Sequence, residues 1–354
     1  MFPYWLLFGA FAAGALGTHP TLQQRRSLGL LWLGALLIVA MIGLRYEIGV
    51  DWGNYLVIWD NAAWASYQQL LSGYAGDPAF YSIVWLLRRG GAEFWVLNFL
   101  CALFFTWGLV KFANQQANPW LAVAVAVPYL VIVIAMSGIR QATAIGFVFL
   151  ALTAFPEKRT LRFLIWVGIA ATFHASAILV VPLAGLSFTK NRFQAVMLLL
   201  AMALGGAYLL GRTFTEYAND YITEGQLESS GTVFRLAMNV LPALLFFKYK
   251  NLMGLQEHEK TLWRNFSYLA FFCILLFVVV PSSTAVDRLL LYIYPLQMLV
   301  LSRLPMAATP KQGGRILLTS GILCYLAATL FVFLSYGVNA YAYIPYKMIP
   351  VFEG

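Results

Sequence analysis

Long apolar runs joined by short polar connections make up most of the chain. Each run is continuous rather than alternating, and many are long enough to cross a bilayer as a helix. They predict helices over residues 3–17, 28–44, 93–110, 119–136, 139–155, 161–173, 174–188, 193–210, 233–247, 265–281, 284–302 and 315–336. The pattern indicates an all-α polytopic membrane protein with about 11–12 transmembrane or half-membrane helices, forming a single integral-membrane domain over residues 1–354.

Two parts of this pattern do not fit simple spans. The runs 161–173 and 174–188 are shorter than the roughly 20 residues of a full span, so they form either a hairpin of half-helices or one long, kinked element. Segment 78–92 is apolar over only about ten residues, which is too short to cross a bilayer. We expect this segment to be interfacial or re-entrant.

Composition supports the membrane class and narrows the possible ligands. Hydrophobic residues make up 61% of the chain and charged residues 10%, whereas soluble domains carry about 25% charged residues. The formal net charge is +9, but the basic residues are scattered over helix ends and form no patch, which argues against nucleic acid as a partner. Cys101, Cys273 and Cys324 lie within apolar runs without metal-ligand spacing, so we expect free thiols, no metal and no cofactor.

The basic residues also orient the chain, because cytoplasmic loops of membrane proteins are enriched in lysine and arginine. With Arg25 and Arg26 in the cytoplasm and with 78–92 not crossing, the cytoplasmic loops hold most of the basic residues and only three of the 14 acidic ones. The segments then predicted to be external are the loops 45–92 and 211–232 and the tail 337–354.

A group of charged residues remains at the external ends of the predicted helices. Ionisable groups inside or beside membrane spans are costly and by default suggest function. Arginine offers a rigid fork to phosphate and stays charged, so several arginines on one face suit a diphosphate. We therefore predict a diphosphate-binding site formed by Arg45, Arg140, Arg235 and Arg288.

Three residues on the same face are candidates for a general base, namely Glu47, Asp51 and His174. Histidine needs little adjustment to accept a proton near neutral pH, whereas neighbouring arginines lower the pKa of a carboxylate. Asp51 has the alternative role of orienting an acceptor sugar. Glu47 and Asp51 alone are too few to bind a metal, so we expect metal-independent chemistry.

A further set of residues is assigned to sugar binding or to structural support: Tyr46, Trp52, Tyr55, Gln141 and Asp287. Each candidate also has a purely structural interpretation, such as an arginine that extends to lipid headgroups, a packing histidine or a local ion pair. Their common position on one face is what favours a functional site.

Three motifs in series resemble the EpsG-type, Wzy-like polysaccharide polymerases. Residues 45–55, reading RYEIGVDWGNY, resemble an Arg-Tyr-x-x-Gly-x-Asp-Tyr-x-x-Tyr signature, with Trp52 in place of the more usual tyrosine. Residues 137–142, SGIRQA, resemble that family's Arg-Gln turn, and residues 173–177, FHASA, resemble its Phe-His-x-Ser segment. With the hydrophobic pattern, the resemblance covers most of the chain.

The resemblance implies a membrane glycosyltransferase with a GT-C-like helical bundle. Such proteins polymerise oligosaccharide repeats carried on undecaprenyl diphosphate, at the periplasmic or extracellular face of the plasma (inner) membrane, in exopolysaccharide, capsule or O-antigen biosynthesis. The growing glycan is transferred from its lipid diphosphate to the non-reducing end of a new lipid-linked repeat. The implied partners are the lipid-linked donor and acceptor, membrane lipids and a chain-length regulator.

Three other functions stay open at this point. An O-antigen ligase would share the external arginines, although we expect a larger external loop than 211–232 in a ligase. A transporter or flippase is less favoured, because the chain shows no clear inverted repeat and few charges in the middle of its apolar runs. The third is a non-catalytic subunit of a synthase complex.

Overall fold

The computed structural model describes residues 1–17, 24–73, 77–188, 231–279 and 283–349. Within these ranges every predicted apolar run coincides with a helix and there is no strand, only an isolated bridge between Arg45 and Met348. The fold class is therefore confirmed as an all-α polytopic membrane protein. The predicted run 193–210 and nearly all of the acidic loop 211–232 lie outside the described residues.

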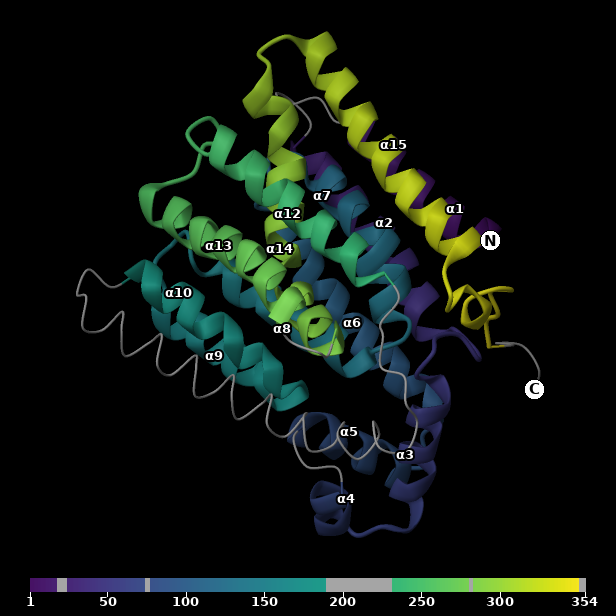
Figure 1. The fold of residues 1–354 in the computed structure, drawn as a ribbon. Coiled ribbons are helices and arrows are strands. Elements are labelled where there is room, and N and C mark those ends of the chain that lie inside the picture. The colour runs from purple at the N-terminus through teal and green to yellow at the C-terminus, as the bar shows by residue number, and fades with distance from the viewer. Residues whose placement is uncertain (18–23, 74–76, 189–230, 280–282, 350–354) are drawn as a thin grey trace.

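The helices of the bundle follow the order of the predicted runs (Figure 1). They are α1 (Phe2–Gly17), α2 (Gln24–Gly43), α6 (Phe94–Ala113), α7 (Pro119–Ala126), α8 (Ile139–Thr153), α9 (Thr160–Phe173), α10 (Val180–Phe188), α12 (Thr232–Tyr249), α13 (Glu257–Val279), α14 (Ser283–Ala308) and α15 (Gln312–Tyr336). Among the described residues, α6, α12, α13, α14 and α15 are long and apolar enough to cross a membrane. The remaining apolar helices are shorter, in keeping with a mixture of full and half spans.

The segment 45–92 was expected to be a loop, but it contains three short helices at one end of the bundle (Figure 1). They are α3 (Trp52–Trp64), α4 (Tyr67–Gly73) and α5 (Pro78–Arg89). Helix α5 buries Phe80 and Val84 on one face and ends with two arginines, so it is amphipathic. Its 12 residues are too few to cross a bilayer, in line with the predicted non-spanning segment.

The apolar segment 119–135 starts as the α-helix α7 and continues as a π-helix. It starts at Pro119, where the side chain of Asn118 accepts a hydrogen bond from the Leu121 amide at 3.0 Å. From Val127 to Ala135 the chain continues as a π-helix, η1. Pro128 within it has no N–H to donate, which favours irregular winding of this kind. Its last carbonyl groups have no partner inside the helix and need donors from elsewhere.

The polar residues form hydrogen bonds in two groups, one at each end of the bundle. Far from α3–α5, Arg303 donates to the carbonyl oxygens of Gln115 (2.8 Å) and Met253 (2.9 Å) and to the side chain of Gln116 (3.1 Å). All four belong to the segments predicted to be cytoplasmic. Several of the predicted external residues contact one another at the other end, so the two predicted groups lie apart, and their orientation across the membrane stays a prediction.

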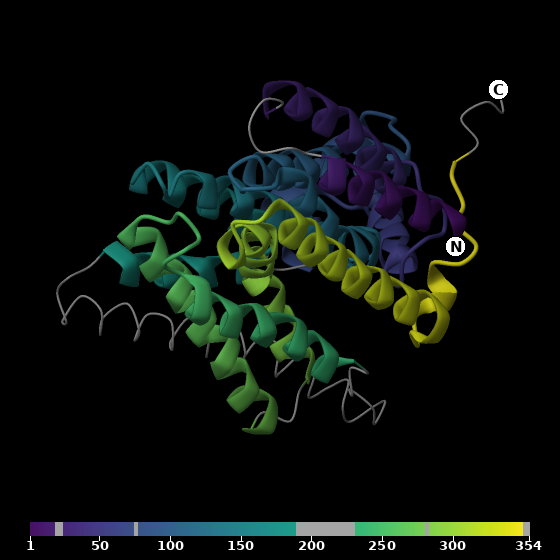
Figure 2. The same cartoon turned by 90° about the horizontal axis from the view of Figure 1, so that it is seen from above.

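The first and last helices of the bundle, α1 and α15, lie side by side (Figures 1 and 2). Helix α15 starts near Arg315, on the Arg303 side, and runs to Tyr336. The chain that follows it therefore returns to the end of the bundle that carries α3.

Helices α6 and α8 cross with their backbones in contact. A Cβ atom at Gly108 would lie 1.8 Å from the carbonyl oxygen of Gly146, and a Cβ atom at Gly146 would lie 2.6 Å from Cα of Phe105. Real Cβ atoms do not approach so closely, so both positions require glycine. Small residues let membrane helices pack backbone to backbone, and this crossing fixes α8 along α6.

We expect Gly146→Ala to destabilise the protein by about 1–3 kcal/mol, because the added methyl group would force the two helices apart. Gly168→Ala is the matched control, since a Cβ atom at this α9 glycine meets nothing within 4 Å, and alanine is the better helix former. Thermal unfolding in detergent, followed by tryptophan fluorescence, compares the two. Equal melting temperatures for Gly146→Ala and the wild type would contradict this account of the crossing.

Candidate active site

Arg45 lies inside the loop that follows α2 rather than on its surface. The residue is 1% exposed. Its guanidinium donates to the carbonyl oxygens of Ile42 and Ile48 (the latter at 3.2 Å) and to Oδ1 of Asn98 at 3.3 Å. The ring of Trp52 lies 5.6 Å from Cζ. Burial lowers the pKa of Arg45 to about 10, so the side chain keeps its charge at neutral pH and holds the loop around itself.

Gly49 lets this loop pass against the end of η1. Its φ of +102° belongs to a region that favours glycine, and a Cβ atom there would lie 2.1 Å from the carbonyl oxygen of Met136. The Gly49 amide donates to the carbonyl oxygen of Ala342 at 2.9 Å. The glycine of the first motif is thus required by backbone geometry and by space.

Asp51 connects the loop to the turn that starts α8. Its carboxylate accepts a hydrogen bond from Ser137 Oγ at 3.0 Å, and the same Oγ accepts one from the Asp51 amide at 3.2 Å. One helical turn later, the hydroxyl of Tyr55 lies 3.5 Å from the amide nitrogen of Arg140. Two residues of the first motif therefore position the second motif.

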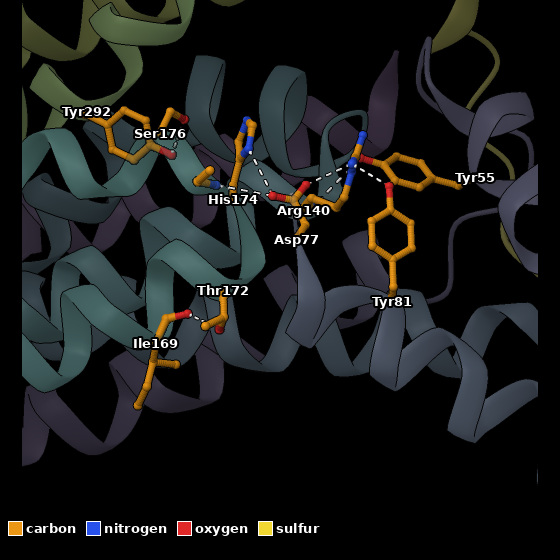
Figure 3. Close-up of polar contacts among 10 residues, drawn as sticks. Tyr55, Asp77, Tyr81, Arg140, Ile169, Thr172, His174, Ser176 and Tyr292 are labelled. Atoms are coloured by element: carbon orange, nitrogen blue, oxygen red, sulfur yellow. Dashed lines mark hydrogen bonds and ion pairs between the residues drawn. The ribbon is translucent and has the colours of Figure 1, made fainter. Parts of the chain in front are cut away.

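The second and third motifs meet at Asp77, the residue immediately before α5 (Figure 3). Arg140 Nη1 lies 2.9 Å from Asp77 Oδ2, and His174 Nδ1 lies 3.7 Å from Asp77 Oδ1. The side chain of Asp77 is only 7% exposed, so its negative charge depends on these partners. The amide of Ala175 also donates to Oδ1, at 3.2 Å. We refer to Arg140, Asp77 and His174 as the central triad.

Aromatic rings surround the guanidinium of Arg140. Its Cζ lies 5.8 Å from the ring centres of Tyr55, Phe80 and Tyr81, and Nη1 also donates to the Tyr81 hydroxyl at 2.8 Å. Nη1 therefore makes two hydrogen bonds, to Asp77 and to Tyr81, and a third of the Arg140 side chain is exposed. An anion could reach this exposed part of the side chain.

His174 stands where the chain leaves α9. It has extended backbone angles, φ −157° and ψ 114°, and it separates α9 from a short 3₁₀ turn that leads into α10. The two short apolar runs are thus distinct helices with a break at the histidine. In the same turn, Ser176 Oγ lies 3.0 Å from the hydroxyl of Tyr292 on α14 (Figure 3), which ties the late helices to the triad.

Arg235 and Asp287 form a second ion pair, between α12 and α14. Arg235 Nε and Nη2 lie 2.8 Å and 2.5 Å from the two carboxylate oxygens, and Thr232 Oγ1 lies 3.2 Å from Oδ2. The ion pair is bidentate, and it links α12 to α14. Arg288 follows Asp287 on α14 and lies one turn before Tyr292.

The remaining predicted residues make contacts outside the triad. Glu47 pairs with Lys347 at 2.7 Å, and this hydrogen bond raises the pKa of Lys347. Tyr46 and Trp52 pack edge to face, with ring centres 6.0 Å apart. Gln141 follows the arginine on α8, and its buried Nε2 has no hydrogen-bond partner in the part of the chain that the structure describes.

Sequence reasoning missed Asp77, Tyr81 and Tyr292, and it named Ser176 only as part of the third motif. Asp77 precedes Pro78 at a helix start, which is typical of an ordinary cap, yet its side chain makes no capping bond and turns to Arg140 instead. One signal could have found it: an arginine beside an apolar run needs a counter-ion, and Asp77 is one of four acids in the predicted external loop 45–92.

This end of the bundle places an arginine and a histidine on the two oxygens of one buried carboxylate. Arginine is a residue type that binds anions, and histidine is one that can accept a proton. Among the described residues, no three His, Cys, Asp or Glu side chains gather where they could bind a metal ion.

A family model, described as the EpsG family, matches residues 30–348. The match includes all three motifs and every residue of the central triad. No curated protein and no solved structure matches the chain.

We expect Gly49→Ala to lower both stability and turnover. Alanine at this positive φ would add a backbone strain of about 1–3 kcal/mol and would displace the Met136 carbonyl. Gly53→Ala, four residues later on α3, is the control, since its Cβ atom would meet nothing within 4 Å. Thermal stability and turnover are measured for both variants. A Gly49→Ala protein that matches Gly53→Ala in both respects would show that the loop does not need this close approach.

Proposed function

The chain belongs to the EpsG family, and from this premise we propose that it polymerises lipid-linked oligosaccharide repeat units. The growing glycan is transferred from undecaprenyl diphosphate to the non-reducing end of a new lipid-linked repeat, on the external face of the plasma membrane. The observation that carries the proposal is the central triad, because it combines a partly open arginine with a histidine at one end of a membrane bundle.

The reaction makes one bond and breaks another. The acceptor hydroxyl oxygen bonds to the anomeric carbon of the donor glycan, and the bond from that carbon to the diphosphate oxygen breaks. The electron pair stays on the leaving diphosphate, and the hydroxyl proton passes to a base. The protein therefore has to stabilise a developing anion and accept a proton.

We assign the leaving diphosphate to Arg140 and Arg288. The exposed part of the Arg140 side chain suits a phosphate group, and Asp77 and Tyr81 hold Nη1 in place in advance. Arg288 shares a helix face with Tyr292, one turn away, and Tyr292 reaches Ser176 beside the triad. Preorganised charge of this kind lowers a barrier because it needs no rearrangement during the reaction.

We assign the base to His174. Asp77 lies 3.7 Å from its Nδ1, and we assign Nε2, on the other side of the ring, to the acceptor hydroxyl. A pH–rate profile unchanged by His174→Gln would exclude this role. Asp51, which is bonded to Ser137, then serves to position the turn at the start of α8.

The other predicted residues act around this centre. Arg45 is enclosed by its own loop and Arg235 is held by Asp287, so we assign both to building the site rather than to direct contact with the diphosphate. Glu47 is paired with Lys347 at the surface. We keep Tyr46, Trp52, Tyr55 and Gln141 as candidates for sugar contacts or structural support, and we keep membrane lipids and a chain-length regulator as proposed partners.

Arg140→Lys is expected to reduce turnover about 10²-fold, since lysine keeps the charge but loses the fork that grips a phosphate. Arg159→Lys is the control, because this arginine is 61% exposed and pairs with Glu157 in a segment predicted to be cytoplasmic. Purified protein in nanodiscs is given undecaprenyl-diphosphate-linked repeats, and longer lipid-linked glycans are resolved as a ladder. A full ladder from Arg140→Lys would remove Arg140 from the diphosphate site.

Turnover is also expected to persist after treatment with EDTA, because we propose that arginines neutralise the diphosphate in place of a metal ion. The same ladder assay measures it, with dialysed and Mg²⁺-supplemented protein side by side. Activity lost with the chelator and restored by Mg²⁺ or Mn²⁺ would overturn this part of the proposal.

The assay also separates the other candidate functions. A ligase would transfer the glycan once to a different acceptor and give no ladder. A flippase would move the lipid-linked repeat across the bilayer without lengthening it. An accessory subunit would be inactive until a partner is added, so a ladder from the purified chain alone favours the polymerase.

A further inference from the structure

The chain after α15 is fastened to the loop of the first motif. Residues 337–349, which we call the C-terminal strap, contain only a short 3₁₀ turn, η3 (Ala340–Ala342). Three backbone hydrogen bonds join the strap to the loop: Gly49 N to Ala342 O (2.9 Å), Tyr46 N to Lys347 O (3.0 Å) and Ile349 N to Leu44 O (2.9 Å). The loop is thus held from both sides, by α2 before it and by the strap alongside it.

Tyr343 is the residue of the strap that reaches deepest into the protein. It is 1% exposed, and its ring packs edge to face on Phe333 with centres 5.1 Å apart. Its hydroxyl donates to the carbonyl oxygen of Val133 at 2.8 Å, and its own carbonyl oxygen accepts from the hydroxyl of Tyr4 at 2.6 Å. One residue therefore connects α1 through its carbonyl group, and α15 and the π-helix through its side chain.

The carbonyl oxygen of Val133 needs a hydrogen-bond donor from outside the π-helix. It lies near the end of η1, where carbonyl groups have no partner within the helix. The next carbonyl, of Ile134, accepts the amides of Ser137 and Gly138, which form the turn before Arg140. A buried carbonyl without a donor would favour rearrangement of this helix end, and with it the turn that carries Ser137.

We infer that Tyr343 is a positioning residue, whose hydroxyl fixes the end of the π-helix and thereby the Asp51–Ser137 contact and the start of α8. The inference rests on the proposed function for its catalytic meaning. Neither the motifs nor the apolar pattern points to this tyrosine, which would otherwise be taken for one of several interfacial aromatic residues in the tail.

Tyr343→Phe is the test, because it keeps the ring on Phe333 and the carbonyl that accepts from Tyr4, and removes only the hydroxyl. Tyr341→Phe is the matched control, since Tyr341 lies two residues away in the same strap and is 74% exposed. Hydrogen–deuterium exchange in nanodiscs is followed for peptides covering 44–52 and 133–141, with peptides from α13 as an internal reference. Turnover by each variant is measured over a range of acceptor concentrations.

For Tyr343→Phe we expect exchange in those two peptides to rise about 5- to 10-fold, the effect of one lost hydrogen bond, with no change in α13. We expect kcat to fall about 10-fold with KM within twofold, because a misplaced site slows the reaction more than it weakens binding. Tyr341→Phe should match the wild type in both measurements.

Unchanged exchange in both peptides would overturn the inference, and so would an equal rise throughout the bundle, which would make Tyr343 a general packing residue. A kcat equal to that of the wild type would overturn the positioning role even if exchange rose. Wild-type protein without turnover would instead reject the proposed polymerase, and the exchange comparison would still decide whether the hydroxyl fixes the helix end.

Discussion

The carboxylate of Asp77 is buried where α5, α8 and α9 meet, and there water cannot stabilise its charge. A buried charge is tolerated only when partners compensate it, so the positions of Arg140, of the Ala175 amide and of the His174 ring are linked to one another through this single group. If Arg140 moved away, the carboxylate would lose the partner that carries a full opposite charge. The local structure of two motifs that are far apart in the sequence follows from that constraint.

The same ion pair also shapes the proposed chemistry. An arginine paired in advance is oriented, but part of its attraction for an incoming anion is already offset by the carboxylate. Such an arginine can stabilise a leaving diphosphate without binding the released lipid so tightly that the next cycle is delayed. The pair of Arg235 with Asp287 repeats this arrangement of a cation with its own counter-ion in the later helices.

The membrane class, the helix positions and the grouping of polar residues on one side could be predicted from the sequence. These three features depend on the length of each apolar run and on where the charges lie, and both can be read directly from the sequence. The roles within the site depend on which side chains face each other. Arg45 looks like an exposed cation after a span, yet it is enclosed by Ile42, Ile48 and Asn98. Asp77 looks like a cap and is the counter-ion. The assigned catalytic roles stay predictions.

The strap also sets an order for assembly. The hydroxyl of Tyr4 and the carbonyl of Tyr343 are 339 residues apart in sequence, so this contact joins two segments that are made at very different times. Since a ribosome makes the N-terminal end first, the loop of residues 45–51 emerges long before residues 337–349, which supply its backbone partners. The contacts that hold this loop can therefore form only after all the membrane helices between the two segments have been made.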